Sequence, residues 1–252
     1  MHRTGCLLVS AGVLVLLAWT VFTTARLARH AVSLQAHARA LPGLTENAAP
    51  DSLHAAGEHL SGMKQDLEEI QASVGPLLPL GRLLAWVPGY GPDLACADDL
   101  FDVAHGVVSA GDRAFRALAP ALDVFVGGGD PNRQVGEEVL PVLLAAAPDL
   151  RIAQGELGAA STARKEIDEA QLSPRVAGLL DRLDRYTPWL EMAVDGALIA
   201  PTLLGAGEPR VYLVVAQNNQ ELRPTGGLIS GVGVLRVEDG RLDSLLFEDS
   251  YT

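Results

Sequence analysis

The sequence is poor in cysteine, which excludes two ways of stabilising a domain. Only two cysteines occur among 252 residues, Cys6 and Cys96, and they lie far apart in the chain. A disulfide framework and a Cys-x-x-Cys metal site are therefore excluded. A single cysteine in a helical pattern is usually a small buried apolar residue, and we interpret Cys96 in this way.

Basic charge is also scarce in most of the chain. All 31 acidic residues but only 16 of the 19 basic residues follow residue 30, which gives that part a net charge of −15. Because a phosphate backbone requires a basic surface, this balance excludes nucleic acid as a partner. The same acidity opposes docking on anionic lipid head groups.

Charge of either sign is absent from residues 5–25, where aliphatic residues dominate. A helix needs about 20 apolar residues to cross the hydrocarbon core, whereas the apolar core of a cleaved signal peptide has only about 7–15. We therefore interpret residues 5–25 as an uncleaved transmembrane signal-anchor that follows a short tail, residues 1–4. Arginines on both sides leave the orientation open. The layout is that of an uncleaved signal, so we expect a cell-membrane protein whose soluble part is extracytoplasmic.

The next 183 residues, 26–208, carry the pattern of a helical stalk and bundle. Apolar residues recur at helical spacing over 27–41, 53–74 and 94–125, and a turn-rich, proline-containing connector separates the last two. Two reversing helices with one apolar seam each favour an antiparallel bundle within the chain; a parallel coiled-coil oligomer is the alternative. Further helices are expected over 135–146, 149–171, 174–187 and 188–200.

The period changes after Pro209. Short apolar runs at 211–215, 228–237 and 242–247 predict strands, and Asp239-Gly240 is a strong signal for a two-residue hairpin. The fold class is thus α+β: a transmembrane helix, a mostly helical body and a small sheet at the C-terminus. Strands that are apolar on both faces require covering layers. We therefore expect residues 209–252 to be the start of an α/β or β domain, incomplete in a chain that is a fragment.

One polar constellation lies between the first two strands. The candidate ligand-binding residues are Asn218, Asn219, Glu221, Arg223, Thr225, Gly226 and Gly227. Arg223 suits a phosphate or carboxylate, and the two glycines allow backbone amides to approach a ligand closely. The alternative is structural, with Asn and Gly satisfying awkward backbone angles while Glu221 pairs with Arg223.

Two carboxylates are expected to return beside this loop. A two-residue turn at Asp239-Gly240 would place Glu248 opposite Gly231 and Asp249 opposite Ser230. Glu248 and Asp249 are therefore candidate ligands for a divalent cation. The sequence implies no other cofactor.

Other polar groups are weaker candidates. His54, Glu58 and His59 match no zinc-binding spacing, and the acidic patch of Asp98, Asp99, Asp102 and His105 is typical of a solvated helix face. We interpret both groups as solvent-exposed.

Residues 212–242, which contain the sequence QNNQELRPTGG, resemble the signature of a bacterial membrane-anchored family of unknown function that domain catalogues number four-zero-one-two. The upstream segment Trp-Val-Pro-Gly, residues 86–89, is similar too. The resemblance implies a single-pass envelope protein, associated with surface polysaccharide pathways, that continues past the last residue of this chain. A looser analogy, at the level of fold only, exists with LytR-CpsA-Psr glycopolymer ligases.

These observations lead to two functional hypotheses. The first is a non-enzymatic binding or accessory module, anchored through residues 5–25, that presents its sheet to an envelope glycopolymer or a protein partner. The alternative is a transferase for lipid-linked phosphosugars that uses Arg223, Glu221 and a cation near Glu248 and Asp249. The sequence leaves open whether the chain is an enzyme, and favours the first hypothesis.

Overall fold

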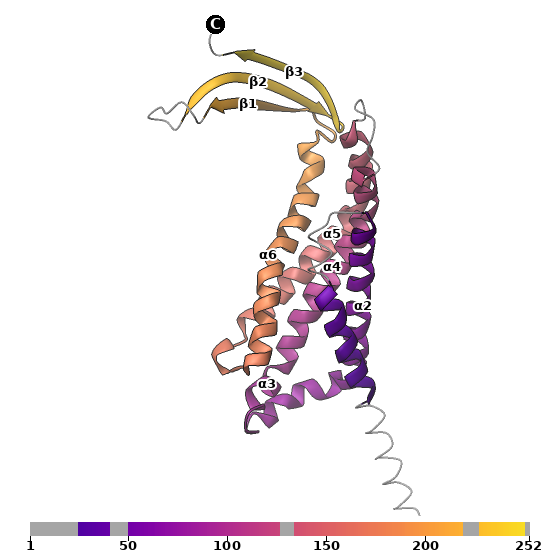
Figure 1. The fold of residues 1–252 in the computed structure, drawn as a ribbon, viewed down its shortest axis with the longest axis vertical. Helices are drawn as coiled ribbons and strands as arrows, with labels where there is room; N and C mark the ends of the chain where they lie inside the picture. The colour runs from indigo at the N-terminus through magenta and orange to yellow at the C-terminus, as the bar shows by residue number, and fades with distance from the viewer. Residues whose placement is uncertain (1–24, 41–49, 127–133, 219–226, 250–252) are drawn as a thin grey trace, which may run out of the picture. The chain divides into compact units, whose positions relative to one another are not determined.

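A computed structural model describes residues 25–40, 50–126, 134–218 and 227–249. The chain is mostly helical and ends in a three-stranded antiparallel sheet, as predicted (Figure 1). The predicted tail and, except for Ala25, the predicted transmembrane segment lie outside the described residues. None of the helices in the described ranges is long and apolar enough to cross a membrane.

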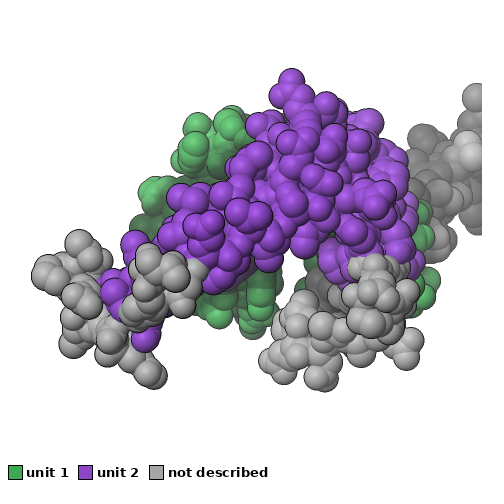
Figure 2. All heavy atoms as spheres, turned by 90° about the horizontal axis from the view of Figure 1, so that it is seen from above, with its two compact units in different colours: residues 1–112, 155–187 green, residues 113–154, 188–252 purple. Residues whose placement is uncertain are grey.

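The chain divides into two compact units (Figure 2). Residues 1–112 and 155–187 form unit 1, and residues 113–154 and 188–252 form unit 2. The boundary falls within three long helices, α4 (Ala97–Val126), α5 (Val135–Lys165) and α6 (Pro174–Leu203), so each of them contributes to both units.

Unit 1 begins with two helices that the apolar spacing predicts. Residues 25–40 are helical, and α2 spans Pro50–Val74. Leu34 and α2 residues pack with α4 around a buried cluster of Leu67, Phe101 and Val108. These contacts lie within one chain, which confirms intramolecular packing of these seams.

The expected turn-rich connector contains more regular structure than predicted. It forms the 3₁₀ helix η1 (Gly75–Leu84) and the short helix α3 (Gly91–Ala95), each with a proline in its first turn. Proline is tolerated there because the N–H that it lacks has no partner inside the helix.

A second apolar cluster of unit 1 surrounds the turn between α5 and α6. Val103, Ile167, Leu172 and Leu180 are buried there, and Cys96 packs against them half-buried, close to its predicted role. Asp168 caps the short 3₁₀ helix η2 (Glu169–Gln171) by accepting a hydrogen bond from the Ala170 N–H.

The four helices predicted between residues 135 and 200 are in fact two. Helix α5 continues through Pro141 and Pro148, and α6 continues through Pro188. A proline inside a helix removes one hydrogen bond and costs about 3 kcal/mol. Near Pro148, which is exposed, Ala146 and Leu150 are both buried. Burial on either side of the proline stabilises the continuous helix, an effect that local sequence rules do not include.

The sheet in unit 2 has the order β1-β2-β3, formed by β1 (Arg210–Asn218), β2 (Leu228–Glu238) and β3 (Arg241–Asp249). Asp239 and Gly240 form the predicted hairpin turn, and both have positive φ values, 44° and 80°. This pair of angles is typical of the type I′ turn, which Asp-Gly favours.

Three glycines join the sheet to the helix ends of unit 2. A Cβ on Gly136, Gly205 or Gly240 would collide with backbone atoms of the facing segment. The hairpin tip is held there by hydrogen bonds from Asp239 N to Gly205 O, 3.2 Å, and from Gly240 N to Leu204 O, 2.8 Å. Since only glycine permits this approach, these residues fix where the hairpin meets the ends of α5 and α6.

Candidate functional site

The predicted ligand-binding loop leaves the sheet between β1 and β2. Asn218 ends β1, is exposed, and pairs with Leu228, the first residue of β2. Most of the candidate residues lie outside the described ranges: Asn219, Glu221, Arg223, Thr225 and Gly226. The proposed roles of Arg223 and Glu221 therefore stay predictions.

Gly227 is buried against its own chain. A Cβ on this residue would lie 2.8 Å from both the Asn218 carbonyl oxygen and the Gln217 side-chain nitrogen. The absence of a side chain at Gly227 therefore allows the two strand ends to close, which is a structural role.

The two candidate cation ligands lie in β3, but the predicted register is wrong by one residue. Glu248 pairs with Val232 and Asp249 with Gly231, because a bulge interrupts the pairing between Arg236 and Val237. The bulge inserts Asp243 as an extra residue, so every partner beyond it shifts by one position. In the described part of the chain, no group of three or more histidine, cysteine or acidic residues is placed to hold a metal ion.

One face of the sheet is apolar and exposed. The register places three cross-strand rows on it: Val211–Arg236–Ser244, Leu213–Val234–Leu246 and Val215–Val232–Glu248. Its six aliphatic side chains range from 38% exposed at Val232 to 69% at Leu213. Antiparallel sheets usually pack one face and expose a polar one, so an exposed aliphatic face is unusual.

The opposite face is partly occupied by residues of unit 2. The Phe247 ring lies over Gly231 and Gly233, where a Cβ on Gly231 would come within 2.6 Å of the ring. Nearer the hairpin, the Tyr212 hydroxyl donates a hydrogen bond of 2.5 Å to the Leu203 carbonyl at the end of α6. This side of the sheet is therefore anchored to α6 near the hairpin, while Leu245 and Phe247 on it are 56% and 54% exposed.

Unit 1 contains a set of polar contacts that the sequence interpretation missed. Three pairs join helix 25–40 to α2: Arg26–Glu69, His30–Asp66 and His37–His59. The numbers rise along one helix and fall along the other, so the two helices are antiparallel. The signal in the sequence was a recurrence of polar residues at helical spacing in both segments, beside the apolar seam.

The two histidine contacts are close. Nδ1 of His30 lies 2.7 Å from an oxygen of the buried Asp66. The Nδ1 atoms of His37 and His59 are also 2.7 Å apart, one donating and the other accepting. The His37 ring lies on Gly62, where a Cβ would come within 2.6 Å. His59 is thus half-buried rather than exposed as predicted, whereas His54 and Glu58 are exposed.

A buried carboxylate links α2 to α4. Asp112 is only 2% exposed; it accepts a hydrogen bond of 2.8 Å from the Ser61 hydroxyl and lies 3.6 Å from the Lys64 ammonium. The Ser-x-x-Lys spacing puts both groups on one helix face. The Asp112 carboxylate of α4 therefore contacts both the serine and the lysine of α2. We interpret this group as a structural contact that holds α2 against α4.

The acidic patch at the start of α4 is only partly solvated, as Asp102 is exposed while Asp98 and Asp99 are half-buried. Desolvation, with repulsion from Asp98 and Asp99, raises the pKa of the Asp102 carboxyl. Desolvation and the charge of Asp99 likewise raise the pKa of the Cys96 thiol. A raised pKa lowers the thiolate fraction, so Cys96 is poorly suited to act as a nucleophile.

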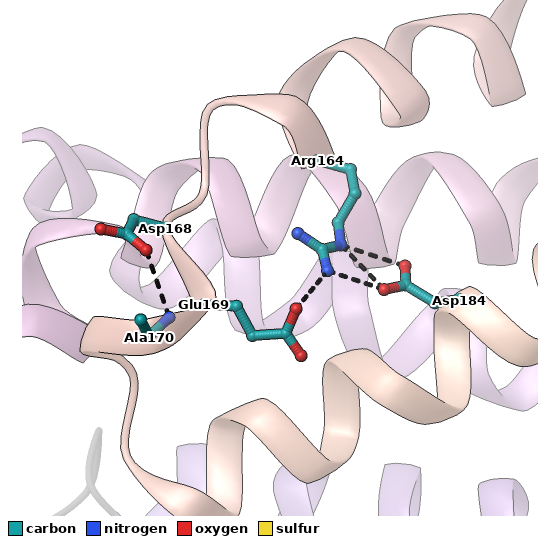
Figure 3. Close-up of polar contacts among 5 residues, drawn as sticks. All are labelled: Arg164, Asp168, Glu169, Ala170 and Asp184. Carbon is teal, nitrogen blue, oxygen red and sulfur yellow. Dashed lines mark hydrogen bonds and ion pairs between the residues drawn. The ribbon is translucent and has the colours of Figure 1, made fainter.

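Arg164 forms a group of ion pairs at the turn between α5 and α6 (Figure 3). Its guanidinium binds both carboxylate oxygens of Asp184, at 2.7 to 3.0 Å, and one oxygen of Glu169, at 2.9 Å. The hydrogen bond with Asp184 raises the pKa of Arg164 further above its usual value. Because every partner belongs to the same unit, this cluster holds the turn between α5 and α6.

One comparison with known proteins gives a partial match, over the sheet. Residues 207–251 match the family described as "Protein of unknown function (DUF4012)". This match confirms the resemblance seen in the sequence over the C-terminal part of the chain, and it carries no activity. No curated protein and no solved structure matches the chain.

Proposed function

We propose that this chain is a membrane-anchored binding module of the cell envelope whose sheet binds a second polypeptide. One observation carries the proposal: the aliphatic face defined by the rows of Leu213, Val234 and Leu246 and their neighbours is exposed. Burying a valine or leucine side chain completely is worth about 1.5–3 kcal/mol. Covering six partly exposed ones therefore provides several kcal/mol of binding free energy.

The chemistry of the face favours a polypeptide over a sugar polymer. Its exposed apolar residues are all aliphatic, whereas sugar rings are usually bound by aromatic platforms together with hydrogen-bonding side chains. Strands β1 and β3 are both edges of the sheet, and an edge strand offers unpaired N–H and C=O groups to an added strand. A polypeptide satisfies both features at once. The connection with surface polysaccharide that the family resemblance implies would then run through this partner.

The anchor in this proposal is the uncharged segment 5–25, which runs directly into the described helix 25–40. An uncleaved signal of this layout places the following domain outside the cytoplasm. The sheet would therefore meet its partner in the envelope.

Cysteine accessibility in intact cells tests the binding surface and the location together. In a full chain carrying Cys6→Ala and Cys96→Ala, single cysteines replace Leu213, Leu246 or, as a control, Ile152. Ile152 lies in α5 of the same unit and is 50% exposed, similar to the sheet positions. Each variant is treated with a membrane-impermeant maleimide in intact cells and again after purification in detergent.

We expect Ile152→Cys to react in both preparations, and Leu213→Cys and Leu246→Cys to react only after purification. Enzymatic removal of surface polysaccharide should leave this protection unchanged, because the cover is a polypeptide. Sheet cysteines that react in cells as fast as Ile152→Cys would rule out a covered sheet. Protection that persists in the purified chain would mean that a second copy covers the face, and no reaction of Ile152→Cys in cells would contradict the location.

A further inference from the structure

A column of exposed apolar side chains runs along η1 and the turn that follows it. Leu77, Leu80, Leu83 and Trp86 are spaced by three and are 60%, 50%, 71% and 78% exposed. In a 3₁₀ helix residues at this spacing lie directly above one another. The leucines therefore form one continuous edge, and Trp86 continues it in sequence.

The inner row of η1 fixes the direction of this edge. Leu78 packs against the buried cluster of Leu67, Phe101 and Val108. Gly81 is buried, and a Cβ there would collide with the Leu94 carbonyl. These contacts hold one side of η1 against the rest of unit 1. The packing of η1 therefore fixes the leucine column on its exposed side.

The position of η1 relates it to the segment that enters unit 1. Arg26, near the start of helix 25–40, pairs with Glu69 near the end of α2. Val74 lies about 7 Å beyond Glu69 along the α2 axis, and η1 follows it directly. The start of helix 25–40 and η1 therefore lie at the same end of unit 1 (Figure 1).

We propose that the column of Leu77, Leu80, Leu83 and Trp86 inserts into the interfacial layer of the bilayer that holds the chain. The inference rests on the proposed anchorage through residues 5–25. That segment ends where helix 25–40 begins, so the column lies at the level at which the chain leaves the membrane. Leucine and tryptophan are the residues with which amphipathic elements enter this layer.

The neighbouring side chains suit this environment. Tyr90, 64% exposed, adds a second aromatic residue with a polar end, and Arg82 is exposed within η1. Arginine at this depth extends its charge to the head groups while its stem stays apolar. Because the chain after residue 30 is acidic overall, apolar burial and not attraction to anionic lipid drives the contact, and zwitterionic lipid is sufficient.

Quenching of tryptophan fluorescence by lipid measures the contact in the full chain. The protein is reconstituted into phosphatidylcholine vesicles with or without bromine on the acyl chains. One variant keeps only Trp86, with Trp19→Phe and Trp189→Phe, and a second keeps only Trp19. A control replaces all three by Phe and carries Glu58→Trp, an exposed α2 position about 24 Å from Val74 along the helix.

We expect brominated lipid to quench Trp86 several-fold more than the tryptophan at position 58. Leu80→Gln with Leu83→Gln in the Trp86 variant should remove most of this quenching while the circular dichroism spectrum is unchanged. Equal quenching at positions 86 and 58, or no effect of the two Gln substitutions, would overturn the proposal. So would shielding of Trp86 from both brominated lipid and aqueous acrylamide, since a second protein copy would then cover the column.

The Trp19 variant separates this inference from the anchorage on which it rests. Strong quenching of Trp19 without quenching of Trp86 overturns the column contact alone. Absence of quenching at Trp19 overturns the anchorage itself, and the column contact with it.

Discussion

At the scale of single residues, glycines determine how closely backbones approach in unit 2. Gly136 in the first turn of α5 and Gly240 at the hairpin tip face each other, and a Cβ on either would meet the backbone of the other segment. Glycine is normally a poor helix residue, less favourable than alanine by about 1 kcal/mol. Its presence at position 136 is therefore explained by the contact with the hairpin and not by helix formation.

Replacing Gly136 by alanine tests this contact through the sign of the effect. We expect Gly136→Ala to lower the free energy of unfolding by about 1–3 kcal/mol, because backbone atoms cannot move aside cheaply. The control Gly196→Ala, in the α6 part of the same unit where a Cβ meets nothing within 4 Å, should raise it by about 0.5–1 kcal/mol. Denaturant titration of the full chain in detergent measures the free energy of unfolding of both variants. Stabilisation by Gly136→Ala would contradict a close backbone contact between α5 and the hairpin.

At the scale of elements, polar clusters hold turns and helix pairs in place. Arg164 in the last turn of α5 binds Asp184 of α6 and Glu169 of η2, so one side chain joins three successive elements of unit 1. Ile167 and Leu172 pack in a buried apolar cluster at this turn, so their apolar surface is removed from water. The forked guanidinium fixes the orientation of the Asp184 carboxylate, since it binds both of its oxygens.

Arg164→Lys keeps the charge and removes the forked geometry. We expect a loss of about 1 kcal/mol in the free energy of unfolding, because an ammonium cannot bind both partners in the same way. Raising the salt concentration should shrink the difference from the unaltered chain. The exposed α6 residue Arg182 provides the control, where Arg182→Lys should change stability by less than about 0.5 kcal/mol. Equal effects of the two substitutions would show that the cluster adds no stability.

At the scale of the whole molecule, the apolar side chains that are buried in unit 2 lie in its helices, whereas those of the described sheet are half-buried or exposed. In unit 2, Leu150 of α5 is fully buried, whereas Leu246 of β3 is 65% exposed. The sheet is therefore attached through its hairpin end and carries little of the core. This distribution is the physical basis for assigning binding to the sheet and stability to the helices.

Two leucines of unit 2 test that distribution. Leu150→Ala should lower the free energy of unfolding by about 2–5 kcal/mol through lost burial and a cavity. Leu246→Thr, which keeps strand propensity, should change it by less than about 0.5 kcal/mol in the purified chain. Chemical denaturation followed by circular dichroism distinguishes the two. A large loss for Leu246→Thr would mean that the face is already covered within the chain.

The sequence by itself determined the helices at 25–40 and in α2, the three strands and the Asp239-Gly240 turn, because periodicity and turn chemistry are local. It also led to the family that matches residues 207–251. Of the candidate site residues, Asn218, Gly227 and Asp249 lie near one end of the sheet, as the strand order predicts, and their role in binding stays a prediction.

Tertiary structure decided the features that depend on contacts between distant residues. Burial near Pro148 joined two predicted helices into α5, and a bulge at Asp243 shifted Glu248 from Gly231 to Val232. The pairing of His37 with His59 likewise comes from packing between elements. So does the outward orientation of the Leu77 column, which follows from the packing of half-buried Leu78 and buried Gly81. Local sequence sets which elements form, since each needs only neighbouring residues; their faces and partners follow from burial, which is a property of the assembled fold.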